Sequence, residues 1–89
     1  MTLVDDFNYL ISKINLGSSF LDGKAILILN GFSSRLKELE ENQEDGLTND
    51  TLIADFNYFI SKVNLKASFL DAKAIKILNN LPSRIKGVA

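Results

Sequence analysis

The sequence predicts an all-α protein of two tandem three-helix repeats, about six helices in all, packed as one pseudo-twofold helical bundle. Three observations predict this fold. Residues 2–37 match residues 51–86 at a constant offset of 49, with 24 of 36 positions identical and no gap. Within each copy the apolar residues recur at spacings of three and four, which is the period of an amphipathic helix. One copy is near the size of ~40 residues below which a chain usually needs help to fold, so the two copies are expected to share a core.

We therefore expect residues 1–89 to form a single domain. Its parts are a first repeat at 2–41, an acidic polar connector at 42–50, and a second repeat at 51–88. The chain is 46% apolar and 24% charged, the composition of an ordinary folded protein.

An apolar stripe predicts the first helix of each repeat. Thr2 and Thr51 stand where an N-cap would, because a threonine hydroxyl accepts a hydrogen bond from the backbone of the first turn. The helix is expected to end near Asn15 and Asn64, since asparagine tolerates the left-handed conformation that closes many helices. The stripe in the first copy consists of Leu3, Val4, Phe7, Leu10, Ile11 and Ile14.

Two further helices are predicted in each repeat. The second helix begins at Ser19 and at Ser68, each followed three residues later by an aspartate in a variant of the capping box. It is expected to end at Gly31 and at Asn80, which align and tolerate positive φ better than other residue types. A third helix then begins about two residues later, because Pro82 suits the first turn of a helix but breaks a helix interior.

The residue types present remove most catalytic and metal chemistry. The chain has no Cys, His or Trp, and therefore no thiol nucleophile, no disulfide, no Cys/His metal site and no histidine base. An acidic stretch at 41–52 has Gly46 at the sixth position of a hypothetical calcium loop, but Leu52 stands where the bidentate glutamate must be. We expect a protein that is not an enzyme and that holds no cofactor or metal.

The N-terminal sequence shows no sign of export. The first residues, MTLVDD, have no basic stretch before an apolar one, so no signal peptide is visible. The longest strictly apolar run is 25–29, far short of the ~18 residues that a membrane span needs. We expect a cytoplasmic protein that does not engage a membrane.

Paired tyrosines carry the main functional hypothesis. Tyr9 and Tyr58 lie roughly opposite the apolar stripe, and tyrosine is favoured at interfaces because it joins a large apolar area to a polar group. Lys13 and Lys62 lie on the same side of the helix. These residues predict a surface that binds another, unidentified protein, as an interaction or adaptor module would. The alternative is that the tyrosines pack against the other repeat or lie singly on the surface.

Position 27 differs between the copies, because Leu27 aligns with Lys76. One repeat therefore has an apolar side chain where the other has a charge. Leu27 is a possible contact with a partner, or with a second copy if the chain is a self-associating building block. An incidental exposed leucine is the plain alternative. We expect a monomer or a weak homo-oligomer.

Charge is distributed unevenly along the chain. Residues 1–50 carry four Lys or Arg and nine acids, whereas residues 51–89 carry six Lys or Arg and two acids. The basic second repeat gives an alternative function as a small nucleic-acid-binding regulator, although a net charge of −1 is far from the basic balance typical of that class. Its phosphate contacts would be Lys73, Lys76, Arg84 and Lys86.

Overall fold

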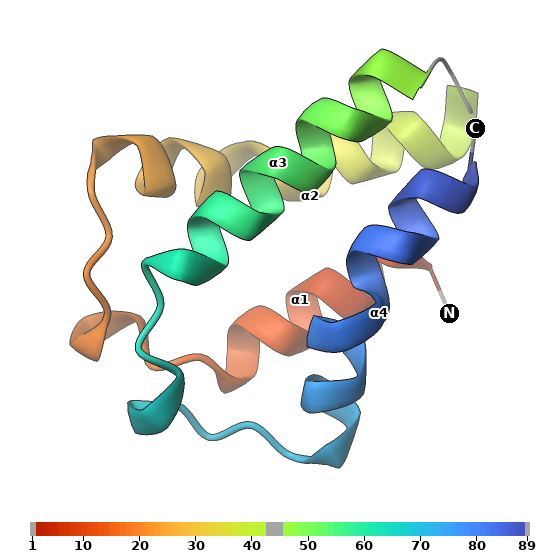
Figure 1. Cartoon of the computed structure of the whole chain (residues 1–89). Helices are drawn as coiled ribbons and strands as arrows, with labels where there is room; N and C mark the ends of the chain where they lie inside the picture. Colours follow the sequence, from red (N-terminus) through yellow and green to blue (C-terminus); the bar gives the residue numbers. More distant parts are fainter. Residues whose placement is uncertain (1, 43–45, 89) are drawn as a thin grey trace.

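The computed structural model describes residues 2–42 and 46–88, and every regular element in these ranges is helical (Figure 1). The all-α class is confirmed. The described ranges hold four α-helices rather than six, so the prediction of two three-helix repeats is wrong. In chain order the elements are α1 (Leu3–Lys13), the 3₁₀ helix η1 (Leu16–Ser18), α2 (Gly23–Asn42), α3 (Gly46–Ser61), the 3₁₀ helix η2 (Leu65–Ala67) and α4 (Ala72–Val88).

The predicted second and third helices of each half are one continuous helix. α2 runs through Gly31, and α4 runs through Asn80 and Pro82. In a helix interior Gly costs about 1 kcal/mol and Pro about 3 kcal/mol relative to Ala. Burying one large apolar side chain contributes about 1.5–3 kcal/mol, so a stripe that continues past these residues outweighs them. The buried stripe is Ile28, Phe32, Leu36 and Leu39 in α2, and Ile77, Leu81 and Ile85 in α4.

The two threonines predicted as N-caps behave differently. The Thr2 side chain caps α1 and accepts a hydrogen bond from the backbone N–H of Asp5 at 3.0 Å, as expected. Thr51 is not a cap, because α3 begins five residues earlier, at Gly46.

The acidic connector predicted at 42–50 is therefore shorter than expected. Residues 46–50 belong to α3, and residues 43–45 lie outside the described part of the chain. Asn49 holds the added turn in place: its side chain is buried, and its amide donates a hydrogen bond to the carbonyl of Ile85 at 3.1 Å.

The N-caps of α2 and α4 lie three residues later than predicted. The carboxylates of Asp22 and Asp71 each accept a hydrogen bond at 2.8 Å from the backbone N–H three residues further along. These aspartates therefore cap the helices. Ser19 and Ser68, which the sequence predicted as caps, lie in the preceding loops.

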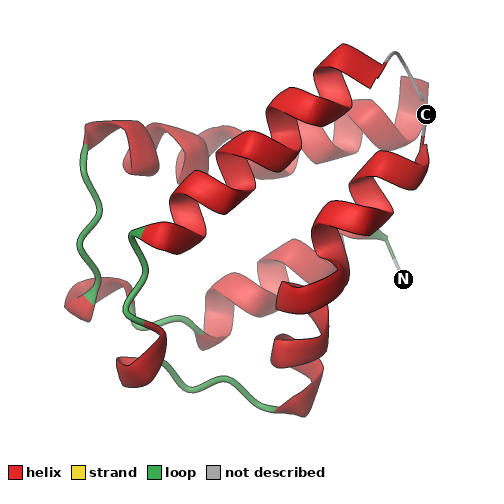
Figure 2. Ribbon diagram, viewed as in Figure 1, coloured by secondary structure: helices red, strands yellow, loops and turns green. Residues whose placement is uncertain are grey.

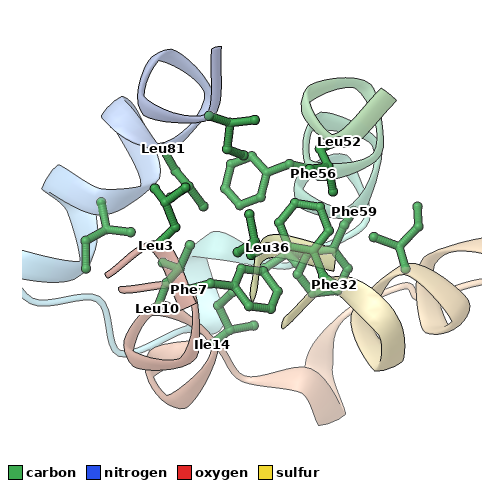
Figure 3. Close-up of a cluster of buried hydrophobic side chains, with 14 of the residues drawn as sticks. Leu3, Phe7, Leu10, Ile14, Phe32, Leu36, Leu52, Phe56, Phe59 and Leu81 are labelled. Atoms are coloured by element: carbon green, nitrogen blue, oxygen red, sulfur yellow. The ribbon is translucent and has the colours of Figure 1, made fainter. Parts of the chain in front are cut away.

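One hydrophobic core is shared by all four helices (Figure 3). At its centre the ring centroids of Phe7 and Phe32 lie 4.7 Å apart, and the Phe56 ring lies 6.5 Å and 6.0 Å from them. α1, α2 and α3 supply these rings, and α4 supplies Leu81. The aromatic cluster thus joins the two halves of the chain.

Each helix packs against one helix of its own half and one of the other half. α1 contacts α2 and α4, and α3 contacts the same two helices. The loops at 14–22 and 62–71 lie together at one side of the molecule, away from the points where α1 begins and α4 ends (Figure 2). We call these two loops the loop end.

Candidate functional site

Backbone hydrogen bonds join the two loops of the loop end. The N–H of Phe20 donates to the carbonyl of Lys62 at 2.8 Å, and the N–H of Phe69 donates to the carbonyl of Lys13 at 2.7 Å. The second bond is the first one shifted by 49 residues, with the two halves exchanging roles.

The loop serines add a second reciprocal pair of bonds. The Ser68 hydroxyl accepts from the N–H of Asn15 at 3.0 Å and donates to the carbonyl of Asn64 at 2.9 Å. Ser19 makes the corresponding bonds at the same distances. Asn15 and Asn64 have φ of −85° and cap the 3₁₀ helices with their side chains, so they are not the left-handed residues that the sequence predicted. Both loops are therefore fixed to each other.

The predicted tyrosines face the other half of the chain. The Tyr9 hydroxyl donates to the carboxylate of Asp71, and the Tyr58 hydroxyl donates to that of Asp22. Chiefly because of this hydrogen bond, and then because of the backbone N–H that each aspartate caps, the pKa of both aspartates lies below its usual value. The same bond raises the pKa of both tyrosines. Both hydroxyls thus bind the other half of the chain, and a contact with a partner stays a prediction.

Lysines lie close to each tyrosine ring. The Nζ atoms of Lys13 and Lys73 are 5.3 Å and 4.3 Å from the centroid of Tyr9, within the range of a cation–π contact. The counterparts around Tyr58, at 5.4 Å and 4.4 Å, are Lys62 and Lys24. Lys13 and Lys62, two of the residues predicted to bind a partner, therefore lie at the edge of the loop end, each 3.9 Å from the aspartate that its tyrosine binds.

Exposed apolar side chains at the loop end are the feature that sequence reasoning missed. Phe20 is 73% exposed and Phe69 is 72% exposed, and Leu16 and Leu65 are each at least one third exposed. The sequence held one signal of this. Both copies keep an aromatic residue at a position that neither the core stripe nor a cap requires.

Leu27 lies on the outer face of α2, and 75% of its surface is exposed. Its counterpart Lys76 is exposed on α4. The structure thus shows that both side chains are accessible at this position, and the predicted contact through Leu27 stays a prediction.

Three of the four basic residues proposed for nucleic acid lie together. Lys73, Lys76 and Arg84 line a hollow of about 320 Å³ beside α4, whereas Lys86 is not part of its lining. Arg84 is also paired with Asp6, which is buried in α1. The hollow has room for one anionic group, whereas nucleic-acid binders contact a row of phosphates.

Comparisons of the chain with protein-family models, curated proteins and solved structures found no match. In residues 2–42 and 46–88, no three His, Cys, Asp or Glu side chains lie close enough together to hold a metal ion. In the same part of the chain, no helix combines the length and the apolar character that crossing a bilayer requires. The loop end and the hollow beside α4 are the two surface features that bear on function.

Proposed function

We propose that the protein is a non-catalytic interaction module, built as a pseudo-twofold pair of helical hairpins whose loop end binds another protein. The observation that supports this is the exposed pair Phe20 and Phe69. A large apolar side chain left in water forgoes about 1.5–3 kcal/mol that burial would provide. Aromatic residues, phenylalanine included, are enriched in protein–protein interfaces relative to the rest of the protein surface.

The loop end is built to hold these rings in place. Hydrogen bonds between the loops fix the backbone at both phenylalanines, and Tyr9 and Tyr58 hold the aspartates that end each loop. A preorganised site loses less conformational entropy when it binds, so more of the contact energy appears as affinity. In this proposal the tyrosines support the surface and the phenylalanines contact the partner.

Charge around the loop end favours a particular partner surface. Four lysines lie against the rings of Tyr9 and Tyr58, a fifth belongs to η2 in the second loop, and the two aspartates beside them are already engaged by the tyrosines. A partner with two apolar pockets and an acidic rim would complement both the rings and the charge. The lysines are Lys13, Lys24, Lys62, Lys66 and Lys73.

A second copy of this chain is a poorer match than a different protein. The hollow beside α4 has charged or polar side chains at five of its six lining residues, although apolar atoms make up most of its exposed surface. A second hollow, of about 490 Å³, lies between the start of α1 and the end of α2 and has four charged side chains in its lining. A phenylalanine ring in either hollow would lie beside charged groups.

The test is the double variant Phe20→Ser/Phe69→Ser, compared with Leu27→Ser. All three positions are highly exposed, so the fold is expected to survive, which circular dichroism checks. The native chain and Leu27→Ser should recover the same proteins from a lysate. The double variant should not recover them. With a purified partner, the affinity should fall at least 30-fold, roughly the effect of losing one hot-spot residue.

Three results would contradict this function. Recovery that is unchanged in the double variant would remove the loop end from partner binding. Phenylalanine-dependent binding to anionic vesicles would indicate a membrane surface instead, and phenylalanine-dependent mass growth with concentration would indicate a second copy.

The nucleic-acid alternative is tested with duplex DNA and RNA. Nucleic-acid binding predicts an affinity that is measurable at low salt and falls steeply as the salt concentration rises. It also predicts that Lys76→Leu/Lys86→Leu loses this binding. Both results together would favour nucleic-acid binding over protein binding.

A further inference from the structure

We propose that the hollow beside α4, which shares Lys73 with the loop end, binds a single phosphate monoester group. At about 320 Å³ it lies at the small end of the range of ligand pockets, with room for a phosphate and the carbons attached to it. α1 contributes one residue and α4 the others. The lining consists of Asp6, Lys73, Lys76, Ile77, Asn80 and Arg84.

The lining carries an excess of positive charge. Its single carboxylate, Asp6, is 6% exposed and accepts a hydrogen bond from Nη1 of Arg84, so its charge is balanced within the protein. This bond uses one of the five N–H donors of the guanidinium and orients the group. The ammonium groups of Lys73 and Lys76 then make the hollow cationic.

One of the two lysines is already positioned. The Nζ atom of Lys73 lies 4.3 Å from the ring centroid of Tyr9, which limits where its charge can go. Lys76 is exposed on the same helix, one turn from Lys73 and two turns from Arg84. The three residues are three, eight and eleven positions apart and share one face of α4, and all three line the hollow.

The first half of the chain shows which of these residues the fold itself requires. Its ion pair between Arg35 and Asp55, at 2.7 Å, corresponds to the pair between Arg84 and Asp6. Lys73 and Ile77 also have identical counterparts at offset 49. The two halves differ at two lining positions only, where Lys76 and Asn80 replace Leu27 and Gly31.

These two differences add a positive charge and a side-chain amide to the lining. The Asn80 side-chain oxygen is buried and is an acceptor, so the NH2 of this amide is the group that can donate to a phosphate. The corresponding position of the first half, Gly31, has no side chain. The lining of the second half thus has one more cation and one more donor than the equivalent positions of the first half.

The charge of the hollow fits a phosphate better than a carboxylate. A phosphate monoester carries −1.5 to −2 at pH 7 and has three strong acceptor oxygens, whereas a carboxylate carries −1. Two lysines and a guanidinium fork match the larger charge and the larger number of acceptors. The phosphate could belong to a small molecule or to a phosphorylated side chain, and the probes below separate these sources.

The test titrates the full chain with inorganic phosphate, ribose 5-phosphate or a phosphoserine peptide. Amide NMR chemical shifts report the binding of each probe. The proposal expects saturable shifts at Lys73, Lys76 and Asn80. Lys76→Leu, which restores the residue of the first half, should weaken binding about tenfold, the effect of losing one charge-assisted hydrogen bond. Lys86→Leu, an equal change of charge on the same helix outside the hollow, should leave the affinity within about twofold. Tighter binding of ribose 5-phosphate identifies a small molecule as the source, and tighter binding of the peptide identifies a phosphorylated protein.

The first half offers a gain-of-function test. Leu27→Lys/Gly31→Asn gives it the same lining, and a Cβ at position 31 meets nothing within 4 Å, so the change is sterically open. A second saturable site should appear there. The proposal is wrong if none of the three probes saturates, if Lys86→Leu weakens binding as much as Lys76→Leu, or if the double variant creates no second site.

Discussion

At the scale of single residues, the tyrosine and aspartate pairs set how the contact between the halves responds to pH. The pKa of Asp71 and Asp22 is lowered in the folded state, so their contribution to stability is present above the unfolded pKa of about 3.9 and is lost as pH falls through the lowered value. The pKa of Tyr9 and Tyr58 is raised. Their contribution is present below about pH 10 and is lost as pH rises through the raised value.

Tyr9→Phe tests this pairing, because it removes only the donor. The pKa of Asp71 should rise toward its usual value and stay somewhat below it, since the backbone N–H at the start of α4 still donates to the carboxylate. The pKa of Asp22 should not change, because its donor is Tyr58. A carboxyl-carbon NMR titration measures both groups in one experiment. If the pKa of Asp71 is the same in the variant as in the native chain, the hydrogen bond from Tyr9 does not lower it.

Only half of the role of these tyrosines can be read from the sequence. Helical periodicity places Tyr9 opposite the apolar stripe of its own helix, whereas in the structure its ring is partly buried against the core. The surface it meets depends on the packing of α1 against α4, which are far apart in the sequence. The same holds for Phe20, because its backbone N–H donates to the carbonyl of Lys62 in the other half.

At the scale of elements, the main disagreement between sequence and structure concerns helix ends. Gly31, Asn80 and Pro82 are each typical of a boundary, and local preference favours a break at each of them. The helices continue because the stripe through Phe32 and Leu81 enters a core built by both halves. Local signals do not contain that information, whereas the period of the stripe is visible in the sequence and runs through the predicted break.

Gly31→Ala tests whether α2 is continuous. In a helix interior, alanine should stabilise the protein by about 0.5–1 kcal/mol, because glycine pays more backbone entropy on folding and the new Cβ meets nothing within 4 Å. Urea denaturation measures the change. Gly87→Ala, which is also sterically open but lies next to the end of α4, is the control and should show a smaller gain. A loss of stability in Gly31→Ala would indicate a left-handed glycine and a helix that ends there.

At the scale of the whole molecule, the contacts between the halves come in exchanged pairs. Arg84 binds Asp6 while Arg35 binds Asp55, and the tyrosine bonds follow the same rule. Each half contains both the donor residue and the acceptor residue of every such contact. The two halves therefore contact each other as the two subunits of an isologous dimer do, within a single chain.

A fragment of residues 46–89 should therefore form a homodimer. It contains Tyr58 with Asp71 and Arg84 with Asp55, so two copies can make every exchanged contact twice. A single copy would leave its core face in water and is too small to fold alone. Helix content by circular dichroism should rise with fragment concentration, and sedimentation should show a monomer changing to a dimer. A fragment that is helical and monomeric at all concentrations would contradict this origin of the fold.

The core of this homodimer supplies a matched pair of variants. In the intact chain Phe32 packs against Phe7 and Phe56, and its counterpart in the second half is the smaller Leu81. The buried pair Leu10 and Phe59 differs in the opposite sense, so a homodimer with two copies of Phe59 and two of Leu81 keeps the same residue types in its core. Leu81→Phe alone should therefore overpack the dimer core and weaken the dimer, because overpacking costs about 1–3 kcal/mol. Phe59→Leu/Leu81→Phe, which gives each copy the two residues of the first half, should weaken it less. Urea denaturation of the fragment and both variants measures the difference, and a tighter dimer in Leu81→Phe alone would contradict this packing.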